Sequence, residues 1–186
     1  MHPPAPLDPL RLPLHGVQLI EASAGTGKTW TIAALYLRLV LGHGREPLLP
    51  PQILVLTFTR AATAELRERI RARLAEAAEV FRGRAAADAL LESLLAAWPD
   101  AAGRAQAARR LELAAQWMDE AAIHTIHGWS QRMLAQHAFA SGQAPGQELD
   151  TDGEALLGEV VRDYWRTHFF ALDRTGAERI AALWRD

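Results

Sequence analysis

The sequence contains no cysteine and no asparagine, and its 20 basic residues include a single lysine, Lys28. The absence of cysteine excludes disulfide bonds and thiolate metal ligands. No apolar run reaches the roughly 18 residues that a membrane-spanning helix needs, and the proline-rich start shows no basic and apolar leader pattern. We therefore expect a protein of the reducing cytoplasm that has no contact with a membrane.

The rest of the composition is ordinary for a globular protein. The chain has 186 residues, of which 49% are hydrophobic and 23% are charged, so it is long enough to bury a real core. The formal net charge is −2, so any contact with nucleic acid must be local. The 36 alanines and 19 arginines indicate a GC-rich coding sequence in which arginine replaces lysine wherever it can. Lys28 then marks a position that requires lysine.

Apolar patterning predicts alternating strands and helices in the first part of the chain. We expect a buried strand over 17–21, a helix over 29–41 and a second buried strand over 53–58, which together make a βαβ unit with parallel strands. A long amphipathic helix is expected over 61–81. The remaining expected elements are helices over 85–97, 102–118, 127–139, 154–170 and 176–185, and a strand over 121–125.

The segment between the first expected strand and helix, Ala22-Ser-Ala-Gly-Thr-Gly-Lys-Thr29, has the pattern of a phosphate-binding loop. Small residues let backbone N–H groups point into one concavity, and the helix N-terminus adds its positive dipole end. Lys28 would contact the phosphates of ATP as a compact charge, and the Thr29 hydroxyl would ligate Mg²⁺. The alternative is a glycine-rich turn that only caps a helix. We predict Lys28 and Thr29 as catalytic residues, with Ala22, Ser23, Ala24, Gly25, Thr26, Gly27 and Trp30 as further nucleotide contacts.

This loop and two later segments resemble superfamily 1A DNA helicases of the UvrD/Rep group. Residues 21–29 are similar to motif I, residues 54–70 (Leu-Val-Leu-Thr-Phe-Thr-Arg-Ala-Ala-Thr-Ala-Glu-Leu-Arg-Glu-Arg-Ile) to motif Ia, and residues 123–134 (Ile-His-Thr-Ile-His-Gly-Trp-Ser-Gln-Arg-Met-Leu) to motif Ib. Within the group, a likeness to helicase–nuclease subunits runs through nearly the whole chain. The resemblance implies an ATP- and Mg²⁺-dependent 3′→5′ DNA translocase that acts with partner subunits at duplex ends and double-strand breaks.

The resemblance also implies the fold, an α/β P-loop NTPase with a RecA-like parallel sheet flanked by helices and a largely helical insertion. We expect residues 1–81 to begin the ATP-binding domain, 82–118 to form a helical segment, 119–139 to return to the domain through motif Ib, and 140–186 to begin the insertion. After motif Ib, the sequence has no hydrophobic strand that ends in an Asp-Glu pair, the motif that activates Mg²⁺ and water in these helicases. The arginine-finger motif, the second RecA-like domain and the nuclease domain are also missing. We therefore expect this part alone to bind nucleotide with little hydrolysis.

By the same resemblance, the ends of the second and third expected strands contact single-stranded DNA. Threonine hydroxyls suit phosphate oxygens, and a phenylalanine face suits a stacked base. Phe58 has a second interpretation as a core residue, and Thr59 as a simple helix cap. Many relatives carry Asn-Lys where this chain has Arg60 and Ala61. The predicted DNA contacts are Thr57, Phe58, Thr59, Arg60, Thr125, His127 and Arg132, and Arg67 is predicted to lie near the nucleotide.

Two other patterns have plainer interpretations. Residues 60–84 hold seven arginines and four glutamates, and pairs at helical spacing such as Glu65–Arg69 explain much of this as a solvated helix. His124 and His127 have no carboxylate or third histidine at ligand spacing, which disfavours a metal site.

For the whole chain, the alternatives are a free-standing P-loop nucleotide-binding module, an AddA- or UvrD-type helicase fragment, and a small kinase. A kinase should show a lid with paired catalytic arginines and an aspartate that binds its substrate, and neither is found in the sequence.

Overall fold

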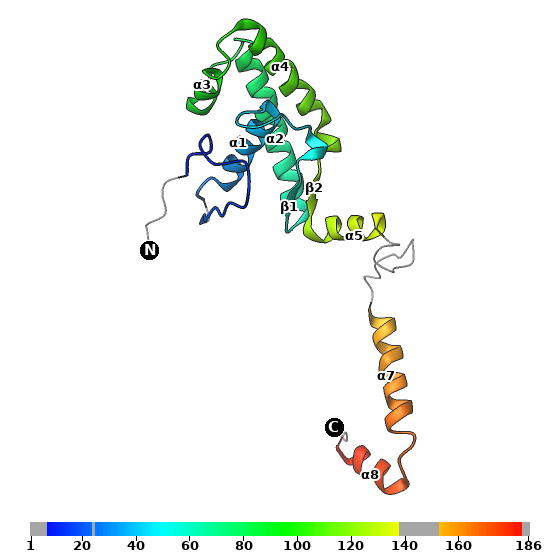
Figure 1. The fold of residues 1–186 in the computed structure, drawn as a ribbon. Coiled ribbons are helices and arrows are strands. Elements are labelled where there is room, and N and C mark those ends of the chain that lie inside the picture. The colour runs from blue at the N-terminus through cyan, green and yellow to red at the C-terminus, as the bar shows by residue number, and fades with distance from the viewer. Residues whose placement is uncertain (1–6, 24, 138–152, 184–186) are drawn as a thin grey trace. The chain divides into compact units, whose positions relative to one another are not determined.

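The computed structural model describes residues 7–23, 25–137 and 153–183 (Figure 1). The chain divides into two compact units, Met1–Gln136 and His137–Asp186, and each is described separately below. None of the described helices combines the length and the apolar character that crossing a membrane requires.

Helices make up most of the first unit, and they lie close to the positions that the sequence predicts. Each of the three helices after α1 begins with a side-chain cap: Thr59 before α2, Asp88 before α3 and Asp100 before α4. The helices are α1 (Lys28–Leu41), α2 (Arg60–Phe81), α3 (Ala89–Leu95), α4 (Ala101–Gln116) and α5 (Ile126–Gln136), and two 3₁₀ turns span Pro50–Gln52 and Trp117–Glu120.

The strands β1 (Val55–Thr57) and β2 (Ile123–Thr125) pair in parallel, with Val55 opposite Ile123 and Thr57 opposite Thr125. Helices α2 to α4 connect them, as a parallel crossover requires. Parallel pairing brings the carboxyl ends of both strands to one edge, where α2 follows β1 and α5 follows β2 (Figure 1). In the part of the chain that the structure describes, the expected parallel sheet is therefore present as a small sheet of two strands.

The strand predicted over 17–21 is wrong. These residues join no ladder among the described parts of the chain, and the side chains of Val17 and Leu19 are 97% and 86% exposed. Their apolar character favours burial, but a strand also needs a neighbouring strand for its N–H and C=O groups and cover for its faces. In this structure β1 pairs with β2 instead, so the βαβ unit expected between residues 17 and 58 does not form.

The hydrophobic core lies between α1, α2 and α4. Ile70 and Leu74 of α2 are almost fully buried, at the four-residue spacing that predicts an inward face. Alanines such as Ala77 and Ala108 are also buried, and their small side chains let α2 and α4 approach closely. Burying one Leu or Ile side chain stabilises the fold by about 1.5–3 kcal/mol.

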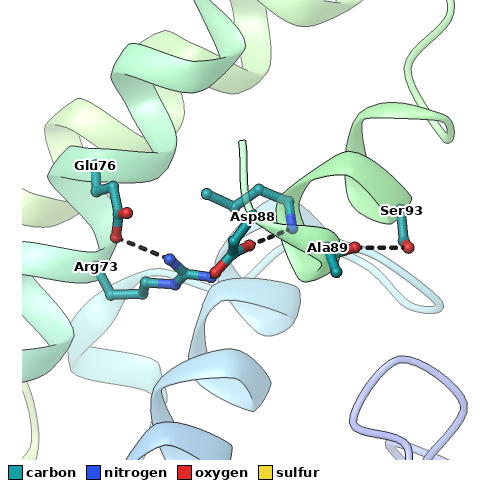
Figure 2. Close-up of polar contacts among 6 residues, drawn as sticks. Arg73, Glu76, Asp88, Ala89 and Ser93 are labelled. Atoms are coloured by element: carbon teal, nitrogen blue, oxygen red, sulfur yellow. Dashed lines mark hydrogen bonds and ion pairs between the residues drawn. The ribbon is translucent and has the colours of Figure 1, made fainter. Parts of the chain in front are cut away.

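A polar contact links α3 to α2. Asp88 Oδ1 accepts a hydrogen bond from Leu91 N at 2.9 Å, which caps α3, and Asp88 Oδ2 lies 2.6 Å from Arg73 Nη2. Figure 2 shows Arg73 between Asp88 and Glu76, whose Oε2 lies 2.8 Å from Arg73 Nη1. The residue that begins α3 is thus held by a side chain of α2.

Arg38 ties the start of the chain to α1. Its buried guanidinium donates hydrogen bonds to the carbonyl oxygens of Pro9 and Leu12 and, at 3.2 Å, to His43 Nδ1. Burial first, and then the charge of Arg38, lower the pKa of His43. The ring nitrogen therefore stays unprotonated and able to accept this hydrogen bond.

The second unit contains two described helices, α7 (Glu154–His168) and α8 (Arg174–Leu183). No residue of either helix is buried, and apolar side chains of α7 such as Leu156 and Leu157 are more than 60% exposed. Trp165 and Phe169 stack at the end of α7, with ring centroids 4.2 Å apart.

Candidate functional site

The loop before α1 has the backbone conformation that its glycines favour. Gly25 and Gly27 adopt φ angles of 78° and 81°, in the left-handed region that other residues rarely enter, and Gly27 directly precedes the helix. A Cβ atom built on either glycine would meet no other atom within 4 Å. The glycines are therefore needed for backbone conformation, and the space beside them is open to a ligand.

Lys28 is the first residue of α1, and its side chain folds back over the loop. Lys28 Nζ lies 2.6 Å from the carbonyl oxygen of Ser23 and 3.4 Å from that of Ala22. The Thr26 hydroxyl donates a hydrogen bond to the same Ser23 oxygen at 2.8 Å. Within the described residues, Lys28 makes no ion pair with a carboxylate. Its charge is therefore available to an anion beside the loop.

These features fit the triphosphate of a nucleotide with Mg²⁺. The ammonium group, the helix N-terminus and the open glycine backbone all favour negative charge. Thr29 is half-buried at the next helical position, and Trp30 is 48% exposed. Ala24, the remaining predicted contact of this loop, lies outside the described residues.

The segment after β1 exposes its aromatic residue. The Phe58 side chain is 87% exposed, so the interpretation of Phe58 as a core residue is wrong. Thr59 does cap α2, because its Oγ1 accepts a hydrogen bond from Ala62 N at 3.1 Å. The hydroxyl oxygens of Thr57 and Thr63 lie 2.5 Å apart, which fixes the turn between β1 and α2. The result is an aromatic face presented to solvent at the carboxyl edge of the sheet.

A pocket of about 370 Å³ lies beside this edge, between α2 and α5. Arg67 reaches across it from α2 and donates a hydrogen bond from Nη2 to the carbonyl oxygen of Ile123 at 3.1 Å. Arg132, on α5, places Nη1 3.4 Å from His124 Nε2. The pocket is lined by Arg60, Thr63, Ala64, Arg67, Ile123, His124, Thr125, Gly128 and Arg132.

Ion pairs account for most of the arginines between residues 60 and 84, as the solvated-helix interpretation predicts. Arg69 pairs with Glu65 at 2.9 Å, and Arg71 pairs with Asp119 at 2.6 Å. Arg73, Arg82 and Arg84 also have carboxylate partners. Of the seven arginines between residues 60 and 84, the two without an ion pair to any described carboxylate are Arg60 and Arg67, and both line the pocket.

The pocket is strongly positive. It contains three guanidinium groups and no carboxylate among its lining residues. Burial, followed by the charges of Arg132 and Arg67, lowers the pKa of His124, so the imidazole is neutral near pH 7. Arg67 Nε is buried without a hydrogen-bond partner among the described residues, which costs about 1–3 kcal/mol. An anion is the ligand that this arrangement favours.

The structure therefore brings together only part of the predicted site. Arg60, Thr125 and Arg132 line the pocket, whereas Phe58 and His127 are exposed outside its lining. Thr125 Oγ1 accepts a hydrogen bond from Gly128 N at 3.1 Å, so Thr125 also caps α5. Arg67, predicted beside the nucleotide, lies in this pocket against β2, and its contact with nucleotide remains a prediction.

Five lining residues were not predicted as site residues: Thr63, Ala64, Ile123, His124 and Gly128. Four of them, Thr63, Ala64, Ile123 and Gly128, lie inside the quoted motif segments but carry no charge that would single them out. His124 has a signal in the sequence, because it is an ionisable residue in a short expected strand, immediately before the predicted contact Thr125. The sequence offers His124 only the disfavoured role of a metal ligand, whereas in the structure its Nε2 lies 3.4 Å from Arg132 Nη1.

The chain matches the model of the UvrD/REP helicase N-terminal domain over residues 6–181. It belongs to this helicase family. Over 184 residues it is 50% identical to the RecBCD enzyme subunit RecB of Escherichia coli (strain K12), an alignment that covers 96% of this chain and 15% of that relative.

Other members of the family give the same result. Identity is 45% to the Haemophilus influenzae RecB subunit, over 95% of this chain and 15% of the relative. It is 37% to the Mycolicibacterium smegmatis RecB subunit, over 88% of this chain and 14% of the relative. The predicted resemblance to UvrD/Rep helicases, and to helicase–nuclease subunits of the RecB type, is confirmed. The chain spans about 15% of the length of these curated relatives.

Proposed function

We propose that this chain is the N-terminal ATP-binding part of an ATP-dependent 3′→5′ DNA helicase and nuclease subunit of the RecB type. Such a subunit would act in double-strand break repair and recombination, with RecC- and RecD-like subunits and single-stranded or duplex-end DNA as its partners. Family membership and 50% identity to a RecB subunit support this proposal. Helicase activity belongs to the whole assembly, and this chain contributes nucleotide binding and part of the DNA track.

The conformation of the loop carries the nucleotide-binding part of the proposal. Two left-handed glycines lead into a helix whose first residue is the single lysine of the chain. In the nucleotide complex, Lys28 Nζ would exchange the carbonyl oxygen of Ser23 for phosphate oxygens, which are charged and therefore stronger acceptors. The Thr29 hydroxyl would hold Mg²⁺, which neutralises charge on the β- and γ-phosphates.

The DNA-binding part rests on the exposed edge of the sheet. We assign base stacking to Phe58 and contacts with the phosphate backbone to Thr57, Thr59, Arg60, Thr125, His127 and Arg132. Three of these residues line a pocket that holds positive charge without a carboxylate. Since the net charge of the chain is −2, this local charge is what would attract a polyanion.

Nucleotide binding and turnover are separate in this proposal. Hydrolysis needs an oriented water, and an arginine finger contributes about 10³–10⁵ in rate. Neither group has a matching motif in the sequence, so the chain should bind ATP with little phosphate release. The fold assignment that goes with this proposal is a RecA-like P-loop domain that is followed by the start of a helical insertion.

The direct test is nucleotide binding by a Lys28→Ala variant. Lys28 is exposed, so its removal should leave the melting temperature unchanged while abolishing the affinity for a fluorescent ATP analogue in the presence of Mg²⁺. Arg45→Ala is the matched control, because Arg45 is also an exposed cation but lies beyond the end of α1. Equal ATP affinity in the wild-type and Lys28→Ala proteins would contradict the proposed nucleotide site.

A further inference from the structure

The pocket between α2 and α5 contains a residue that the expected DNA contacts do not include. We propose that this pocket binds a phosphodiester group of single-stranded nucleic acid and that His124 takes up a proton when it does so. The inference rests on the proposed DNA-binding function and deepens it. It assigns a specific contact to His124 and makes the affinity for nucleic acid depend on pH.

The chemistry of the pocket selects a phosphate. Arg60, Arg67 and Arg132 supply guanidinium groups, whose planar donors match the oxygens of phosphate, and none of the described residues that line the pocket is acidic. A volume of about 370 Å³ has room for a phosphodiester with part of its sugars. Phe58 is 87% exposed at the end of the adjacent strand and offers a face for a neighbouring base. A nucleic-acid strand fits this combination better than a free phosphate ion does.

Two donors in the pocket lack an acceptor among the residues that the structure describes. The oxygen of Thr125 accepts from Gly128 N, which leaves the hydroxyl proton free to donate to a ligand. Arg67 donates to Ile123 through Nη2, but its buried Nε has no partner among the described residues. A small rotation of this guanidinium toward an anion in the pocket would give Nε an acceptor.

The surroundings of His124 explain the linked proton. Arg132 on α5 lies 3.4 Å from Nε2, Arg67 and Arg60 face the pocket from α2, and β1 carries no titratable side chain. Without a ligand, burial and then the charges of Arg132 and Arg67 lower the pKa of His124, and its neutral Nε2 can accept from Arg132. A phosphate among these groups reverses the balance, because both His124 and Arg132 then donate to one anion.

The proposal is tested by measuring affinity for a fluorescein-labelled (dT)₁₂ oligonucleotide at pH 6, 7 and 8 and constant ionic strength. If binding takes up one proton, affinity falls as the pH rises, by at most about tenfold per pH unit. Between pH 6 and pH 8 the wild-type protein should therefore lose affinity more steeply than a His124→Gln variant. His15→Gln is the control, because His15 is exposed and lies outside the pocket. Its pH dependence should match that of the wild-type protein.

A second measurement does not depend on the variant. The His124 ring is titrated by NMR in the wild-type protein, with and without saturating (dT)₁₂, and its pKa should rise in the complex. An unchanged ring titration, or equal pH dependence in wild-type and His124→Gln proteins, would overturn the proposal while leaving the proposed function intact. If the wild-type protein bound no oligonucleotide even at pH 6, both the DNA-binding part of the proposed function and this inference would be wrong.

Discussion

Asp88 and Arg73 form an ion pair, with 2.6 Å between Oδ2 and Nη2, that connects the cap of α3 to the middle of α2. Helix α3 has only seven residues, too few to be stable without tertiary contacts. The Arg73 side chain is 12% exposed and that of Asp88 is 44% exposed, so the pair is partly screened from water. The position of α3 therefore depends on this contact as well as on its buried leucines.

Replacing Asp88 with alanine should destabilise the first unit. The substitution removes the N-cap of α3 and one of the two carboxylate partners of Arg73. We expect the free energy of unfolding to fall by about 1–2 kcal/mol, which urea denaturation would measure. Glu92→Ala is the matched control, because Glu92 is an exposed carboxylate of the same helix that does not cap it. Equal losses in both variants would argue against a special role for Asp88.

The charge of Asp88 should also make stability depend on pH. Partial burial alone would raise the pKa of Asp88, but the hydrogen bond from Leu91 and the contacts with Arg73 together hold it below its ordinary value. A carboxylate with a lowered pKa stabilises the fold above its unfolded-state pKa, about 3.9, and loses this contribution as pH falls through the folded-state pKa.

An Asp88→Asn variant isolates this effect, because asparagine can still cap a helix but carries no charge. The difference in unfolding free energy between wild-type and Asp88→Asn proteins should be constant from pH 5 to 8 and should shrink below about pH 4. A difference that grew as the pH fell would mean that the sign of the pKa shift is wrong.

Arginine should not replace Lys28, although it keeps the charge. The ammonium group sits 2.6 Å from the Ser23 carbonyl, inside a loop of small residues, and a planar guanidinium is larger and differently shaped. We expect Lys28→Arg to lose affinity for the fluorescent ATP analogue almost as completely as Lys28→Ala. Arg45→Lys provides the reverse exchange at an exposed site and should bind normally. Wild-type affinity in Lys28→Arg would show that any cation suffices.

Phe58→Ala should weaken binding of the (dT)₁₂ oligonucleotide without destabilising the protein. A stacked base contributes about 1–3 kcal/mol, so we expect a loss of about fivefold or more in affinity. Since the side chain is 87% exposed, the melting temperature should not change. Phe170→Ala removes a phenylalanine that is 80% exposed in the second unit and serves as the control. Unchanged affinity in Phe58→Ala would remove the stacking assignment.

Local sequence signals predicted the helices and the loop well, because their causes are local. The spacing of Leu66, Ile70 and Leu74 defines the buried face of α2, and Gly27 and Gly42 have the left-handed conformation that bounds α1. The strand at 17–21 was wrong because strand formation depends on a distant partner, which an apolar run does not specify.

The pocket could not be predicted for a related reason. Its residues come from α2, β2 and α5, and the packing of α2 and α5 against β2 places them around one space. Sequence spacing showed seven arginines on one segment, but not that Arg60 and Arg67 are the two without an ion pair to a described carboxylate. Those two residues become distinctive only after the other five have found partners.

The pairing of β1 with β2 also has a consequence for the order of folding. In the sequence, β1 precedes and β2 follows the three helices α2, α3 and α4. The two strands can therefore pair only after this long segment has closed into a loop. Helices α2 and α4 are closer in sequence than the two strands are, and they pack extensively against each other, which favours early formation of that helical pair. We expect strand pairing and the hydrogen bond from Arg67 to Ile123 to form late. Partly folded molecules on this pathway would then contain the packed helices α2 and α4 but not yet the anion pocket between α2 and α5.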